Sequence, residues 1–140
     1  GLALLAQRGY HRYEISAFAQ PGSQARHNLN YWEFGDYLGI GAGAHGKLST
    51  LRGDGSLAIT RTRKTRMPRQ YLAAAGLYLV ERAEVPDSER PFEFMMNALR
   101  LNKGFNQSLF EQRTNLPISI IDKELSLAKD KKLIIQKQKH

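Results

Sequence analysis

A run of alternating glycines limits what the middle of this 140-residue chain can form. From Leu38 to His45, glycine occupies every second position, at Gly39, Gly41 and Gly43. A period of two predicts a β-strand, here with one face of almost bare backbone. Glycine inside a strand packs nothing and costs backbone entropy, so its repetition indicates that a ligand or another backbone approaches closely. The alternative is a bulged or tightly packed strand among small side chains.

The segment just before it, His27 to Trp32, gathers an imidazole, two carboxamides, a phenol and the only tryptophan of the chain. A neutral imidazole is a good iron ligand, and Tyr31 and Trp32 offer flat apolar faces with one polar group each. The alternative is a hydrogen-bonded loop histidine beside two aromatic core residues. The residues alone leave both interpretations open.

Composition narrows the classes of protein. The chain has no cysteine, which excludes disulfides and an iron–sulfur cluster ligated by cysteines of this chain. No apolar run reaches the ~18 residues of a membrane helix, and the start, Gly1 to Ala6, lacks the basic region of a signal peptide. We therefore expect a cytoplasmic protein. A length of 140 residues allows one fair-sized core or parts of two small ones.

The net charge of +8 is unevenly distributed. Five cations and no acid fall between Arg61 and Gln70, and a second cluster of lysines extends from Lys129 to Lys139. The first run suits either a phosphate-contacting strip or a solvated edge strand protected by its charge. The total charge favours a polyanion or an acidic partner without identifying it.

In the first half, residues 2–6 predict the end of a helix that Gly9 closes, and residues 13–18 predict a strand. Gln20 to Ser23 predicts a loop. The Arg52 to Gly55 segment, between apolar alternations, predicts a hairpin turn.

In the second half, Pro68 predicts the start of a helix that runs to Val85, and we place a domain boundary before it. Further predicted helices cover residues 92–99, 106–113 and 119–128, followed by a strand from Leu133. In the first of these, the positions Phe92, Met95, Met96 and Leu99 have the spacing of one buried helix face. Three helices and a strand describe a winged-helix-like unit. Acids around Lys123 disfavour a DNA-reading third helix.

Four segments carry a resemblance to a known family: YEISAFAQPG from Tyr13, RHNLNYW from Arg26, GDYLGIGAGAH from Gly35, and RPFEFMMNALR from Arg90. They resemble the C-terminal part of radical S-adenosylmethionine (SAM) proteins related to oxygen-independent coproporphyrinogen III oxidase. The complete His-Asn-x-x-Tyr-Trp motif is most similar to the heme-chaperone branch, in which it is associated with heme binding. The decarboxylating branch lacks this motif at the same point.

The resemblance implies an α/β fragment. Residues 1–67 would form the C-terminal end of a partial radical SAM β/α barrel with a strand-rich extension, and residues 68–140 a winged-helix-like domain of three helices. The complete protein would carry SAM and a [4Fe–4S] cluster. The ligands of that cluster would lie in an N-terminal half that this cysteine-free chain does not contain.

The resemblance also implies two groups of site residues. The residues expected at the heme are His27, Asn28, Asn30, Tyr31 and Trp32. His27 would bind the heme iron, and Asn28 or Asn30 would orient its imidazole. The residues expected near SAM are Gly41, Ala42, Gly43, Ala44 and His45.

These implications favour heme binding and transfer in porphyrin and heme metabolism over decarboxylation. The partners would be heme or a porphyrin, the N-terminal half of the same protein, and a heme-receiving protein that the sequence does not identify. A fragment of a coproporphyrinogen III dehydrogenase and a basic winged-helix module that binds nucleic acid are the alternatives. The chain shows no nucleophile–base spacing, so we assign it no catalytic residue.

Overall fold

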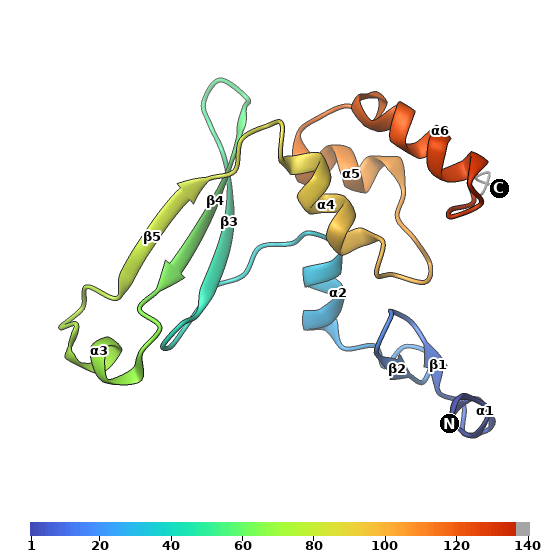
Figure 1. The fold of residues 1–140 in the computed structure, drawn as a ribbon, viewed down its shortest axis with the longest axis horizontal. Helices are drawn as coiled ribbons and strands as arrows, with labels where there is room; N and C mark the ends of the chain where they lie inside the picture. The colour runs from blue at the N-terminus through green and yellow to red at the C-terminus, as the bar shows by residue number, and fades with distance from the viewer. Residues whose placement is uncertain (137–140) are drawn as a thin grey trace.

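The computed structural model describes residues 1–136 and has mixed helix and sheet, as expected for an α/β fragment (Figure 1). The elements in chain order are α1 (Leu2–Gln7), β1 (His11–Arg12), β2 (Phe18–Ala19), α2 (Arg26–Trp32), β3 (His45–Leu51), β4 (Leu57–Lys64), α3 (Pro68–Ala73), β5 (Leu79–Glu84), α4 (Arg90–Ala98), α5 (Gln107–Thr114), the 3₁₀ helix η1 (Ile118–Ile121) and α6 (Asp122–Asp130). Lys137, Lys139 and His140, which belong to the basic C-terminal segment and the predicted second domain, lie outside the described residues.

The main sheet is an antiparallel three-stranded arm of order β3-β4-β5. It extends away from the helices, and α3 lies at its far end (Figure 1). The predicted hairpin turn from Arg52 to Gly55 is confirmed, because β3 and β4 pair on either side of it. Of the two alternatives for the basic run, the edge strand is wrong. The first half of the basic run lies on β4, which is the central strand and pairs on both sides.

The predicted glycine strand from Leu38 to His45 is also wrong. Residues 38–44 form an irregular loop, and β3 begins only at His45. Gly41 and Gly43 have φ angles of 101° and 71°. This left-handed region is incompatible with a regular strand and favours glycine. The alternation therefore reflects a turn that brings the chain into β3.

The N-terminal segment combines one confirmed and one wrong prediction. Helix α1 ends before Gly9, whose φ angle of 76° closes it as expected. Of the strand predicted over residues 13–18, only Phe18 belongs to a strand, β2; residues 13–17 form a bend between β1 and β2, which pair with each other. The bend follows from Glu14, which is buried and accepts hydrogen bonds from the backbone and hydroxyl of Ser16.

The long helix predicted from Pro68 to Val85 is wrong beyond its first turns. Helix α3 ends at Ala73, and positive φ angles at Ala75 and Gly76 reverse the chain. The remaining residues form β5, which pairs with β4. The division into residues 1–67 and 68–140 stays a prediction.

The helices α4, α5 and α6 were predicted, but the buried face of α4 was not. Phe92 and Met96 are 69% and 61% exposed, whereas Phe94 and Ala98 are fully buried. Phe94 and Ala98 are also four residues apart, so the sequence offered two competing faces. The ring of Phe94 makes edge contacts with three other phenylalanine rings, which form the centre of the core: Phe34, Phe105 and Phe110.

Of the two predicted helix caps in the helical unit, one is confirmed and one is wrong, and the predicted strand is not found in the described part of the chain. Asn106 caps α5 as expected, since its side chain accepts a hydrogen bond from the Leu109 amide at 2.8 Å. Ser119 does not cap the last helix, because it lies inside η1. The strand predicted from Leu133 is absent from the part of the chain described up to residue 136, so the unit has no wing there.

Two buried cations connect these parts. Lys47 on β3 is 1% exposed and donates to the Phe34 carbonyl (2.9 Å), to Asp36 (3.1 Å) and to Ser49 (3.2 Å). The first two partners lie just after α2, so Lys47 attaches that segment to the sheet. Its ammonium also lies 4.1 Å from the centre of the Phe34 ring.

The second buried cation, Arg90, is 3% exposed at the start of α4. It donates to the carbonyls of Leu57, Val85 and Thr114, which belong to β4, the end of the sheet and α5. Arg90 therefore joins the sheet to the helical unit in the way that Lys47 joins it to α2.

We predict that Lys47→Met lowers the free energy of unfolding by about 3 kcal/mol, because it leaves the buried Phe34 carbonyl without its donor and removes the cation that pairs with Asp36. Urea denaturation followed by circular dichroism measures the change. Lys123→Met, at an exposed position of α6, should change it by less than about 0.5 kcal/mol. Equal losses in the two variants would contradict the assigned role of Lys47.

Asp36 should give the stability of the fold an acid-sensitive component. Burial raises the pKa of its carboxyl, but hydrogen bonds from Ser49 and Lys47 outweigh this and hold the pKa below its ordinary value. Since the folded-state pKa is depressed, the stabilisation is complete above the unfolded pKa of about 3.9 and is lost as the pH falls below it. Asp36→Asn should therefore flatten the dependence of unfolding free energy on pH between about 5 and 2. An unchanged slope in Asp36→Asn would contradict this role of the carboxylate.

Candidate functional site

The motif predicted to bind heme forms a helix, α2, rather than a loop. Helical spacing places His27 and Tyr31 on one face, because they are four residues apart, and Asn28 and Trp32 on the neighbouring face. His27 is exposed and Tyr31 is 39% exposed. The motif is thus divided into an outward pair and an inward pair.

The outward pair continues onto the sheet through aromatic contact. The rings of Tyr31 and Tyr37 meet edge to face with centroids 4.6 Å apart. The Tyr37 hydroxyl accepts a hydrogen bond of 2.8 Å from Arg61 on β4. Within residues 1–136, the His27 imidazole has no hydrogen-bond or ion-pair partner, so its ring nitrogens are free to bind a ligand.

The inward pair fixes the helix. The Arg100 guanidinium lies 4.2 Å from the centre of the Trp32 ring and also binds the buried Glu14 carboxylate at 3.2 Å. Burial raises the pKa of Glu14, but hydrogen bonds from Ser16 and the interaction with Arg100 together hold it below its ordinary value. Trp32 therefore packs beside Arg100, away from the face that carries His27.

The two asparagines of the motif have structural partners. The Asn28 amide donates to the Tyr13 hydroxyl at 3.1 Å, and the Asn30 amide donates to the Asp36 carbonyl at 2.9 Å. Neither donates to His27 among the described residues. The expected orientation of the imidazole by Asn28 or Asn30 is therefore not present in this structure.

The residues expected near SAM, Gly41 to His45, do not lie on α2. It forms the turn at the start of β3, at the end of the sheet arm where α3 is found, whereas α2 lies beside α4 (Figure 1). The close approach expected at the glycines is made by the chain itself, because a Cβ atom on Gly39 would lie 2.2 Å from the His45 carbonyl oxygen. The turn also borders an open hollow of about 390 Å³.

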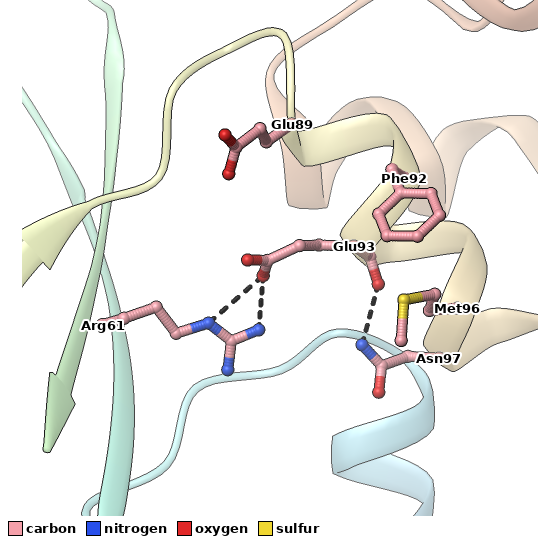
Figure 2. A pocket seen from close by; sticks show the side chains of 6 residues that line it. All are labelled: Arg61, Glu89, Phe92, Glu93, Met96 and Asn97. Atoms are coloured by element: carbon pink, nitrogen blue, oxygen red, sulfur yellow. Dashed lines mark hydrogen bonds and ion pairs between the residues drawn. The ribbon is translucent and has the colours of Figure 1, made fainter.

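A further hollow, of about 400 Å³, lies between α4 and β4 and was not predicted (Figure 2). Phe92 and Met96 form its apolar part, and the ion pair between Arg61 and Glu93 forms one side. The sequence signal was the spacing of Phe92 and Met96, which we interpreted as a buried face. Within the described residues, no three histidine, cysteine or acidic side chains gather as a metal site, and no helix is long and apolar enough to cross a membrane.

Comparison with known proteins identifies the family of this chain. Residues 85–140 match the model of the HemN C-terminal domain. The chain is 46% identical over 136 residues to "Heme chaperone HemW" of Haemophilus influenzae, which covers 97% of this chain and 34% of that protein. It belongs to the HemN family.

Two further relatives support this assignment. "Heme chaperone HemW" of Escherichia coli is 45% identical over 91% of this chain and 32% of its own length. "Radical S-adenosyl methionine domain-containing protein 1, mitochondrial" of Bos taurus is 33% identical over 80% of this chain and 26% of its own length. The chain spans about a third of the first two relatives. No solved structure matches it.

These matches confirm the predicted family and its HemW branch. The prediction was based on the runs from Tyr13, Arg26, Gly35 and Arg90, and the matched domain model covers the last of them. The runs from Tyr13 and Gly35 adopt a different secondary structure from the one expected. The individual site residues stay predictions, since the comparisons assign no roles to residues.

The glycine turn allows a test of whether its glycines are needed for close backbone contact or only for their backbone conformation. Gly39→Ala would force its new Cβ against a backbone carbonyl, so we expect it to destabilise the chain by about 2 kcal/mol or more. Gly41→Ala meets open space and carries only the penalty of its positive φ angle, about 1 kcal/mol. Thermal unfolding measures both. A larger loss at Gly41 than at Gly39 would contradict this geometry.

Proposed function

We propose that this chain is the part of a radical SAM protein that carries heme and passes it to an acceptor. The names of the HemW relatives support heme binding, and the exposed, unpaired His27 on α2 is the observation that connects this function to a residue. The chain covers only a third of those relatives, so the proposal concerns the complete protein.

The residues around His27 fit a heme. An imidazole with both nitrogens unengaged can bind iron, and heme supplies an iron with axial coordination positions when it is bound. Tyr31 lies one helical turn after His27, and Tyr37 packs against it, so the two rings offer aromatic surface for a flat apolar ring. Arg61, which donates to the Tyr37 hydroxyl and pairs with Glu93, lies beyond these rings.

The rest of the motif positions α2. Trp32 is held by Arg100, Asn28 by Tyr13, and the segment that follows the helix by Lys47. These contacts leave the His27 face open while they fix the helix behind it. We propose that they hold the imidazole at a constant place relative to the sheet.

The rest of the protein supplies the radical SAM chemistry in this proposal. SAM and a [4Fe–4S] cluster belong to the complete protein, with SAM near residues 41–45, and no cluster ligand comes from this cysteine-free chain. We propose a cytoplasmic location for the protein. We assign it heme transfer rather than decarboxylation, because the relatives that match over most of the chain are named heme chaperones.

The test is heme titration of the intact protein, followed by its Soret absorption. His27→Ala should shift the Soret band and weaken heme binding about tenfold or more, because an iron–imidazole bond is lost. His11→Ala, also at an exposed position, is the matched control and should leave both unchanged. If His27→Ala alters neither the spectrum nor the affinity, His27 is not the ligand.

A further variant tests the inward face of α2. Arg100→Ala removes the group that lies over Trp32 and pairs with Glu14, so α2 should become mobile while His27 is retained. We expect weaker heme binding with the Soret maximum of the wild-type protein, because the ligand is unchanged. A changed Soret maximum would instead place Arg100 or Trp32 at the heme.

A further inference from the structure

The positive charges next to the end of α2 are compensated by acids of the chain itself. Within residues 1–136, four cations hold residues 32–37 through hydrogen bonds, ion pairs or aromatic contact. Each of them forms an ion pair with an acidic side chain. The pairs are Arg100 with Glu14, Lys103 with Glu33, Lys47 with Asp36, and Arg61 with Glu93. These four cations therefore offer no uncompensated charge to a ligand on α2.

Arg26 on α2 differs from these four cations. It immediately precedes His27, it is exposed, and its side chain forms no ion pair or hydrogen bond within residues 1–136. Successive residues of an α-helix lie about 100° apart around its axis. Arg26 therefore flanks His27 on the side opposite Asn28, whose amide is bound to Tyr13. An uncompensated positive charge thus adjoins the proposed iron ligand, outside the inward face of the helix.

Two other arginines provide a comparison. Arg12 and Arg69 are also exposed and form no ion pair in the described part of the chain. Arg12 precedes Tyr13, the partner of Asn28, and Arg69 lies on α3 at the far end of the sheet arm (Figure 1). Neither of them adjoins the imidazole along the chain, as Arg26 does.

We propose that Arg26 binds a propionate carboxylate of the heme, so that the site selects porphyrins with free acid groups. This inference rests on the proposed heme site and names the part of the ligand that the chain recognises. Heme carries two propionate side chains at one edge of its ring, and both are ionised at pH 7, as ordinary carboxyl groups are. A guanidinium donates two parallel N–H bonds to one carboxylate. A ring held through its iron alone can turn about the iron–imidazole bond, whereas this second contact fixes its orientation.

The test compares heme with its dimethyl ester, in which both carboxylates are neutral. Both are titrated into the intact protein in the same neutral detergent and followed by Soret absorption. Arg26→Gln should weaken heme binding about fivefold, because an exposed charge-assisted contact is lost. It should change the affinity for the dimethyl ester by less than about twofold, since the ester offers no charge to bind. An equal loss for both ligands, or no loss for heme, would overturn the proposal.

Three further variants assign the effect to one position. Arg26→Lys keeps the positive charge and should recover most of the heme affinity. Arg12→Gln and Arg69→Gln are the matched controls, because each removes an exposed cation without an ion pair among the described residues. Each should change the heme affinity by less than about twofold. A loss in either control as large as that in Arg26→Gln would overturn the assignment to Arg26.

The spectrum separates this inference from the proposed iron ligand. Arg26→Gln retains His27, so its heme complex should keep the Soret maximum of the wild-type protein, whereas His27→Ala should shift it. If His27→Ala has this effect and Arg26→Gln has none on either ligand, the heme site is supported and the propionate contact is wrong. If Arg26→Gln weakens heme but not its ester while His27→Ala changes nothing, the propionate contact is supported and the iron ligand is wrong.

Discussion

The buried ammonium of Lys47 joins the segment that follows α2 to the sheet, and the geometry of the candidate heme site depends on it. Its three hydrogen bonds go to Phe34, Asp36 and Ser49, so no donor of the group is left unsatisfied. Phe34 has a left-handed backbone, with φ of 56°, and a fully buried ring. Such a conformation is uncommon for an aromatic residue and persists where the surroundings determine it. Lys47 binds the carbonyl and covers the ring of this one residue.

Buried cations have this importance because the apolar core is small. The core cluster centres on Phe94, while large apolar residues such as Ile40, Leu72 and Phe92 stay exposed. A chain with so little apolar burial needs other connections between its elements. Arg90 supplies one, through carbonyls of β4, the end of the sheet and α5. Both cations hold backbone carbonyls, which fixes where the chain runs as well as how stable it is.

The sequence predicted local features well and their arrangement less well. The Asn106 cap, the Arg52 hairpin and the closure at Gly9 depend on neighbouring residues, and all three are confirmed. The glycine alternation failed because a period of two does not distinguish a strand from a turn with positive φ angles. The face of α4 failed because two apolar stripes competed, and the choice between them was made by Phe34 and other residues distant in sequence. At the candidate site, the sequence indicated the members of the motif but could not divide them into an inward and an outward pair, since that required knowing that the motif is helical.

The division of the α2 motif into an outward and an inward pair suits a protein that transfers heme better than one that stores it. A heme enclosed on all sides must wait for the protein to open before it can leave, and its release is then limited by that motion. On α2, the contacts that fix the helix come from Trp32 and Asn28, while His27 and Tyr31 stand at the surface. A ligand held at such a face can be approached by an acceptor while the imidazole still binds it. In the proposed site, the same residues therefore combine a fixed ligand position with an accessible ligand, and the proposed transfer of heme requires both.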